Sequence, residues 1–91
     1  MKEGLAENKV LILYLLNKLQ DGIKSDNLYK VVSSANNMNY FYFQELLTDL
    51  IESNFVGSFT KDEDTIIKIT SDGQNALSLT KSLLPGILKL K

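Results

Sequence analysis

The chain has 91 residues, of which 44% are hydrophobic, and ten basic and eleven acidic residues give it a net charge of −1. This length suits one small domain with a single core, which gains from a partner. The sequence contains no histidine, cysteine or arginine. Disulfides, thiolate metal sites, the usual general base and bidentate guanidinium contacts are therefore excluded.

The charges are distributed unevenly along the chain. Residues 36–60 carry three acids and no lysine, whereas residues 76–91 carry three lysines and no acid. A free-standing nucleic-acid-binding protein is more often basic overall. The longest apolar run, residues 10–16, is too short to span a bilayer, and the N-terminus lacks a signal-peptide layout. We therefore expect a cytoplasmic protein without a membrane partner.

The first predicted element is a helix at about residues 7–20, which Gly22 would end as a C-terminal glycine does. One face is apolar at helical spacing: Leu5, Ile12, Leu15, Leu16 and Leu19. A second side is also apolar and, with hydrophobic residues of the C-terminal segment, forms a candidate dimer interface: Val10, Leu13, Tyr14, Leu83, Ile87 and Leu88. Either another helix of the same chain covers this second side, or a second subunit does.

Two further helices are predicted after a short extended link at residues 23–24. The second spans about residues 26–35 with Ser25 as its N-cap, and the third spans about residues 40–53 with Asn39 as its N-cap. On a helical wheel the third helix has an inward arc of Tyr40, Phe43, Leu46, Leu47, Leu50 and Ile51. Its outward arc holds Phe41, Tyr42, Glu45, Thr48, Asp49 and Glu52. Either Phe41 packs under the hairpin or against the second helix, or Phe41 and Tyr42 form an exposed aromatic pair rimmed by acids.

A β-hairpin and a fourth helix complete the predicted elements. Strands at about residues 55–60 and 65–70 are rich in aromatic and β-branched residues, and the four residues KDED join them. Alternation of isoleucine and lysine in the second strand predicts one buried and one exposed face. The fourth helix spans about residues 72–84, with Ser71 as its N-cap, and Pro85 breaks it.

The order helix, extended link, helix, turn, helix, hairpin, helix predicts an α+β winged helix-turn-helix, as a single domain at residues 1–91. The stretch IIKITSDGQNAL contains the pattern I-T-x-x-G-x-x-x-L, which resembles the exit from the wing in PadR-like and MarR-like regulators. With ENKVLILYLLNKL and MNYFYFQELLTDLIESNFV, it is more similar to a bacterial winged-helix family catalogued as a domain of unknown function. These stretches cover most of residues 7–77, and the resemblance implies a transcriptional regulator.

The third helix and the wing are the candidate DNA-binding elements of a dimeric regulator that binds double-stranded DNA. Glutamine can pair with adenine, glutamate can accept from cytosine and threonine can contact a thymine methyl group, while lysines contact phosphates. The candidate DNA-binding residues are Lys24, Ser25, Asn39, Tyr42, Gln44, Glu45, Thr48, Lys61 and Lys68. The acidic third helix and acidic wing tip favour an alternative, a winged-helix protein-interaction module without DNA binding.

No arrangement of residues in the sequence is typical of an enzyme. The sequence has no glycine-rich phosphate loop, and its serines lack an evident base. The acids Asp62, Glu63 and Asp64 lack the spacing and the turn glycine of a calcium loop. We therefore expect a protein without enzymatic activity, cofactor or metal. Any small-molecule effector is left open.

Overall fold

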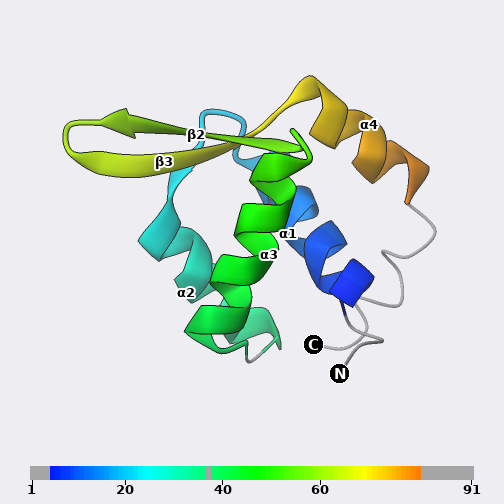
Figure 1. Cartoon of the computed structure of the whole chain (residues 1–91), viewed down its shortest axis with the longest axis horizontal. Coiled ribbons are helices and arrows are strands. Elements are labelled where there is room, and N and C mark those ends of the chain that lie inside the picture. Colours follow the sequence, from blue (N-terminus) through cyan, green and yellow to red (C-terminus); the bar gives the residue numbers. More distant parts are fainter. Residues whose placement is uncertain (1–4, 37, 81–91) are drawn as a thin grey trace.

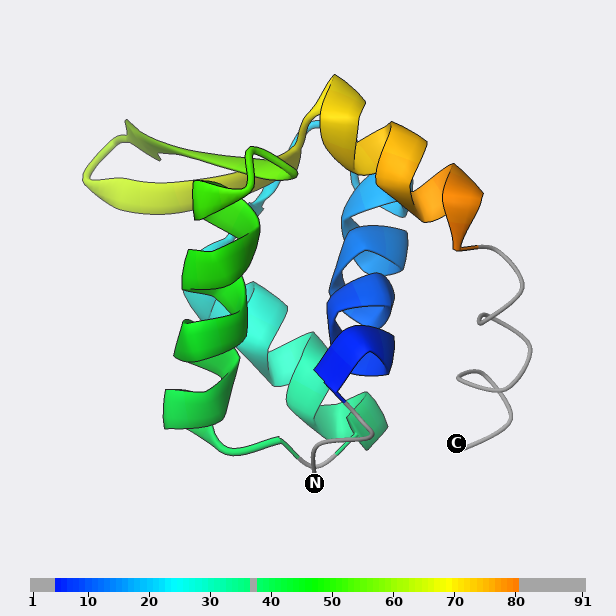
Figure 2. The same ribbon diagram turned by 45° about the vertical axis from the view of Figure 1, so that its right-hand side comes forward.

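The structure is a computed structural model that describes residues 5–36 and 38–80. Its elements in chain order are α1 (Leu5–Lys18), β1 (Ile23–Lys24), α2 (Ser25–Asn36), α3 (Tyr40–Glu52), β2 (Val56–Lys61), β3 (Asp64–Ile69) and α4 (Ser71–Leu79). Helices α1, α2 and α3 form a bundle, and the sheet lies across one end of it (Figures 1 and 2). Helix α4 lies at the same end and packs on α1. The chain is therefore an α+β winged helix-turn-helix, as its element order predicts.

One hydrophobic core lies between the three helices and the inner face of the sheet. Its completely buried large side chains are Ile12, Leu16, Leu28, Val32, Phe43, Leu46, Leu50, Val56 and Ile67. They come from α1, α2, α3, β2 and β3, so each of these elements is held by burial of apolar surface rather than by its own propensity. Within the described residues, no helix is long and apolar enough to cross a membrane.

The three strands form an antiparallel sheet in the order β1-β3-β2. Ile67 lies opposite Ile23 of β1 and Ser58 of β2, so β3 is the central strand. Ile67 and Ile69 are buried while Lys68 between them is exposed, which confirms the predicted alternation. The sheet therefore has an inner face on the core and an outer face toward solvent.

The wing hairpin is tighter than the sequence suggests. Lys61 pairs with Asp64, so only Asp62 and Glu63 form the loop, and the predicted four-residue loop is wrong. Both loop residues have positive φ, at 51° and 69°, as a type I′ turn requires. Such turns favour Asn-Gly, so the pair Asp-Glu gave no sequence signal for this geometry.

The predicted end of the first helix is also corrected. Helix α1 ends at Lys18, before residue 20, and Gly22 lies in the turn that follows. Gly22 has φ of +96°, and a Cβ there would lie 2.7 Å from Cγ2 of Ile66 and 3.2 Å from the carbonyl oxygen of Ile67. Gly22 therefore lets the chain turn and pass close to β3, where β1 begins. Ser25 is the first residue of α2 rather than the residue before it.

Helix α3 has the predicted N-cap and a well-defined C-terminus. The side-chain oxygen of Asn39 accepts a hydrogen bond from the backbone N–H of Tyr42 at 2.9 Å, which confirms the cap. At the other end Asn54 has φ of +66°. The Asn54 N–H donates to the carbonyl of Ile51 at 3.0 Å, and the Phe55 N–H donates to that of Leu50 at 2.9 Å. These two bonds form a Schellman motif that leads directly into the wing.

The motif I-T-x-x-G-x-x-x-L forms the junction between wing and α4. Thr70, not the predicted Ser71, is the N-cap of α4: its hydroxyl oxygen accepts from the Gly73 N–H at 2.9 Å and donates to the carbonyl of Asn54 at 2.6 Å. A Cβ on buried Gly73 would lie 2.0 Å from the carbonyl oxygen of Phe55, so only glycine fits there. The described part of α4 ends at Leu79, and the predicted residues 81–84 lie outside the described residues.

Candidate nucleic-acid interface

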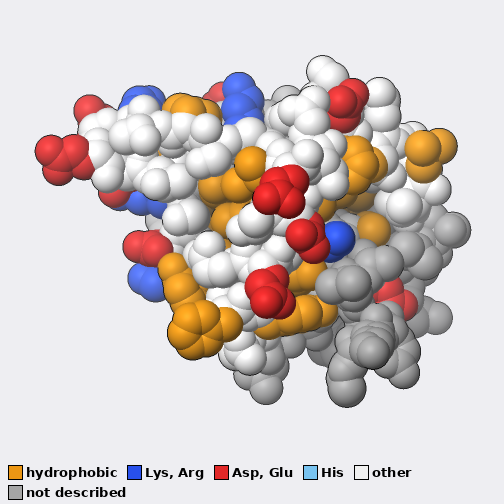
Figure 3. Space-filling model, in the orientation of Figure 1, with side chains coloured by type: hydrophobic (Ala, Val, Ile, Leu, Met, Phe, Trp, Pro, Cys, Tyr) orange, Lys and Arg blue, Asp and Glu red, His pale blue; other side chains and the backbone are white. Residues whose placement is uncertain are grey.

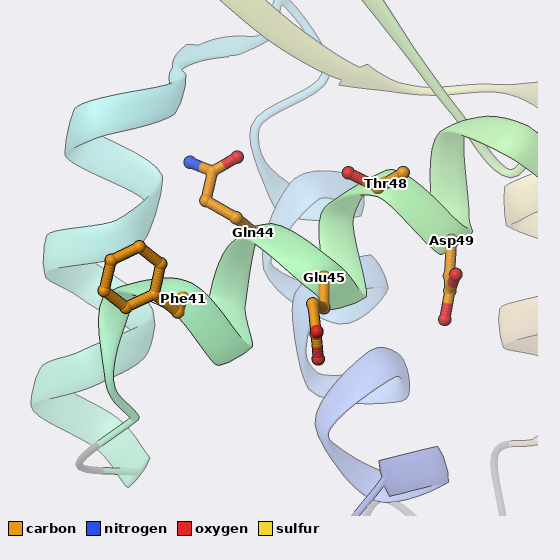
Figure 4. A pocket seen from close by; sticks show the side chains of 5 residues that line it. All are labelled: Phe41, Gln44, Glu45, Thr48 and Asp49. Atoms are coloured by element: carbon orange, nitrogen blue, oxygen red, sulfur yellow. The ribbon is translucent and has the colours of Figure 1, made fainter.

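The exposed face of α3 is the surface that a winged-helix protein would present to a DNA groove. A shallow depression runs along it, and Figure 4 shows the five side chains that line it: Phe41, Gln44, Glu45, Thr48 and Asp49. Among the described residues, no group of histidine, cysteine or acidic side chains is arranged to hold a metal ion. The chemistry of this face is therefore that of hydrogen bonding, apolar contact and charge.

The exposed face of α3 divides into two strips along its length. In Figure 4, Gln44 and Thr48 point toward the side where the sheet and α2 lie, whereas Glu45 and Asp49 point the opposite way, toward α1. The carboxylate of Asp49 lies 3.4 Å from the ammonium group of Lys9 on α1, which agrees with this direction. The strip of Phe41, Gln44 and Thr48 carries no charge, and we call it the neutral strip.

The exposed acids of α3 form a second strip, which we call the acidic strip. It consists of Glu45, Asp49 and Glu52, all exposed, and acidic groups are visible along α3 at the centre of Figure 3. Lys9 forms the only salt bridge to this strip within the described residues. Glu45 and Asp49 point away from the sheet, so they leave Gln44 and Thr48 uncovered (Figure 4).

Tyr42 does not belong to the outer surface. Its side chain is half-buried against the core, and its hydroxyl accepts a hydrogen bond of 3.1 Å from the side-chain amide of Asn8 on α1. The side chain of Tyr42 therefore ties α3 to α1, and its contact with DNA stays a prediction. Phe41 is 82% exposed, so the interpretation that it packs under the wing or against α2 is wrong.

Aromatic rings form a row from the core to the tip of the neutral strip. The ring centroid of Tyr29 on α2 lies 5.3 Å from that of buried Phe43. It lies 5.2 Å from the ring centroid of Tyr40, which it meets edge-on. Tyr40 in turn lies 6.2 Å from the ring of Phe41. Tyr40 is 45% exposed and Ile51 is 38% exposed, so their predicted inward positions are wrong. Both residues lie at the margins of the inward arc, where a helical wheel does not decide burial.

Exposed lysines lie on the outer face of the wing and on β1. Lys61 and Lys68 share the outer face of the hairpin with Phe59, which pairs with Ile66. All three are exposed, and Figure 3 shows basic and hydrophobic side chains together along the top of the hairpin. Lys24 of β1 lies 3.3 Å from Asp64 of the wing, and both side chains are about half-exposed.

The remaining predicted DNA contacts are placed as follows. Gln44 and Thr48 lie on the neutral strip, Glu45 lies on the acidic strip, and Asn39 is exposed but uses its side-chain oxygen to cap α3. Ser25 is half-buried in the first turn of α2. Phe41 is not among the predicted DNA contacts, but its exposure agrees with its predicted place on the outward arc.

The chain matches, over residues 8–90, a family described as Domain of unknown function (DUF4364). The chain belongs to the DUF4364 family. No curated protein matches it at a significant level. Two solved structures share its fold: SSV1 F-93, with 21% identity and a TM-score of 0.77, and AF1382 from Archaeoglobus fulgidus, with 20% identity and a TM-score of 0.66. The first alignment covers 92% of each chain, and the second covers 93% of this chain and 88% of AF1382.

The candidate dimer residues of this DUF4364 chain do not form an exposed apolar surface in the described structure. Val10 and Leu13 are only 5% and 3% exposed, so the chain itself already covers the second side of α1. Tyr14 is half-buried, with the ammonium group of Lys18 5.0 Å from its ring centre. The other predicted residues of this interface, Leu83, Ile87 and Leu88, lie outside the described residues.

Proposed function

We propose that this DUF4364 chain is a DNA-binding transcriptional regulator that places α3 in the major groove of duplex DNA. The observation that carries the proposal is the division of the exposed face of α3. Glu45 and Asp49 point toward α1, whereas the uncharged side chains Gln44 and Thr48 point toward the wing and α2. The winged-helix fold supports a groove-binding role by analogy.

Exposed lysines of β1, α2 and the wing would supply the phosphate contacts. Lys30, Lys61 and Lys68 are exposed and form no salt bridge within the described residues, and Lys24 can exchange Asp64 for a phosphate. Because each neutralised phosphate contributes about 0.9 to the salt slope, one copy would show a slope of about −3 to −4. A chain of net charge −1 would bind weakly with so few contacts. We therefore propose that it acts as a dimer, which doubles the slope to about −6 to −8.

The test is fluorescence anisotropy of a labelled random duplex at several salt concentrations, with light scattering of the same sample for its mass. Affinity for the duplex should fall steeply as salt rises. The measured slope should be the one expected for the monomer or the dimer, whichever the light-scattering mass shows. A variant with Lys30, Lys61 and Lys68 changed to Gln should lose most of the slope. Lys18→Gln is the matched control, because Lys18 lies over Tyr14 on α1. A folded protein that binds no duplex at low salt would refute the proposal.

A second candidate function is protein recognition, and the exposure of Phe41 favours it. An aromatic side chain that is 82% exposed beside acids resembles the anchor of a protein interface more than a phosphate contact. In that case the duplex titration would show no binding, and Phe41→Ala would abolish binding to a protein partner. The same two measurements therefore separate the two functions.

A further inference from the structure

The neutral strip has a spacing that matches successive base pairs. Phe41, Gln44 and Thr48 occupy positions i, i+3 and i+7 of α3, so they lie on one side over two helical turns. Seven residues of α-helix rise about 10.5 Å, and base pairs in B-DNA are about 3.4 Å apart. The strip therefore spans about three base pairs when α3 lies along the groove.

The side chains of this strip match only part of the major-groove chemistry. A glutamine amide pairs with N6 and N7 of adenine, and apolar groups, including the methyl group of threonine and the ring of phenylalanine, contact the C5-methyl group of thymine. The commonest specific contact to guanine needs arginine or lysine, and the strip contains neither. The strip therefore fits A·T pairs and offers little to G·C pairs.

The ring of Phe41 is exposed at the outer end of the aromatic row. The aromatic row joins its ring to Tyr40 at 6.2 Å, then to Tyr29 at 5.2 Å, and Tyr29 contacts buried Phe43. Phe41 also follows the capped start of α3, where Asn39 fixes the first turn. The ring of Phe41 is therefore accessible to an apolar group of a ligand at the start of the strip.

We propose that the neutral strip recognises A·T-containing duplex DNA by its thymine methyl groups. Phe41 and the methyl group of Thr48 contact C5-methyl groups of thymine, and the amide of Gln44 pairs with adenine. The inference rests on the proposed function, because it requires α3 to enter the major groove. It deepens that function by naming the chemical class of site that the protein prefers.

Replacement of thymine by uracil tests the proposal because it removes the C5-methyl group and keeps the base pair. Anisotropy titrations would compare an A·T-rich duplex with the same duplex containing deoxyuridine, both at low salt. The thymine duplex should bind more tightly by roughly fourfold for each methyl group that is buried. A G·C-rich duplex should bind more weakly than the thymine duplex. Replacing its cytosines by 5-methylcytosine should restore part of the affinity, because this methyl group occupies the same place in the groove.

Three variants assign the effect to residues. Phe41→Ala and Thr48→Ser should each reduce the preference for thymine over uracil, and both side chains are exposed, so the fold should persist. Phe59→Ala is the matched control: it removes an exposed aromatic ring from the outer face of the wing and should leave the preference unchanged.

The outcomes separate the two proposals. Equal binding of the thymine and uracil duplexes by the unmodified protein would overturn methyl recognition and leave DNA binding intact. A preference that survives in the double variant of Phe41 and Thr48 would also overturn it. Absence of binding to any duplex would overturn both, and would turn the search to a protein that contacts Phe41.

Discussion

Gly73→Ala is expected to destabilise the whole fold, because the glycine sits where α4 touches the start of the wing. A Cβ at this position would lie 2.0 Å from the carbonyl oxygen of Phe55 and 2.7 Å from Cγ1 of Ile69. To remove this overlap, α4 would have to move by more than about 1 Å, because the atom that blocks the new Cβ belongs to the backbone. That shift would strain the 3.1 Å bond from the Thr70 N–H to Phe55 and the cap formed by the Thr70 hydroxyl.

The size of the effect follows from two losses and one gain. Overpacking costs about 1–3 kcal/mol, and a weakened N-cap costs about 1 kcal/mol. Alanine returns about 1 kcal/mol in helix propensity. We expect the free energy of unfolding to fall by about 1–3 kcal/mol. With a urea m-value near 1 kcal/mol/M for a small domain, the midpoint should fall by about 1–3 M.

Urea denaturation followed by circular dichroism measures this midpoint. Gly57→Ala is the matched control, because the nearest atoms to its added Cβ are 4.0 Å away, and it should change stability by less than about 0.5 kcal/mol. If Gly73→Ala were as stable as Gly57→Ala, the packing of α4 against Phe55 described above would be wrong.

Three further changes test other features. Glu63→Gly should raise the free energy of unfolding by about 0.5 kcal/mol, as measured in a thermal melt. Glycine adopts the positive φ of 69° without the strain of a side chain, and the entropy cost of ordering glycine offsets part of this gain. Tyr42→Phe should lower stability by about 0.5–1.5 kcal/mol in urea while leaving duplex affinity unchanged; weaker duplex binding would return Tyr42 to the interface. The triple change of Glu45, Asp49 and Glu52 to amides should raise duplex affinity several-fold at low salt and much less at high salt, by anisotropy. An unchanged affinity would mean that these acids lie away from the DNA.

Periodicity predicted the elements because apolar spacing reports directly on burial. Phe43, Leu46, Leu47 and Leu50 of the predicted inward arc are all buried. The same wheel misplaced Tyr42, because a wheel gives the direction of a side chain but not the neighbour that it meets. Tyr42 points away from the centre of the inward arc, yet a residue 34 positions away in the sequence meets its hydroxyl.

The caps and turns show where local sequence ceases to decide. Thr70 and Ser71 are both good N-cap residues, and the choice between them depends on a contact with the backbone of Asn54, 16 residues earlier. The tight turn at Asp62 and Glu63 is likewise set by the pairing of the two strands rather than by residues that favour positive φ. In the candidate site, the sequence predicted an acidic outward arc. The packing of α3 on α1 is what shows that Glu45 and Asp49 point away from Gln44 and Thr48.

The two-residue connection between β2 and β3 constrains how the wing can change in length. One extra residue in a single strand would form a β-bulge or lengthen the loop. If the pairing shifted instead, the lysines and threonines of that strand after the insertion would move to the opposite faces of the sheet. Adding two residues to each strand preserves the existing pairs, closes the turn with the same type of pair and lengthens the hairpin by about 6.6 Å. Variants with altered reach along a bound duplex should therefore be built in matched pairs of insertions, with Asp62 and Glu63 kept as the tip.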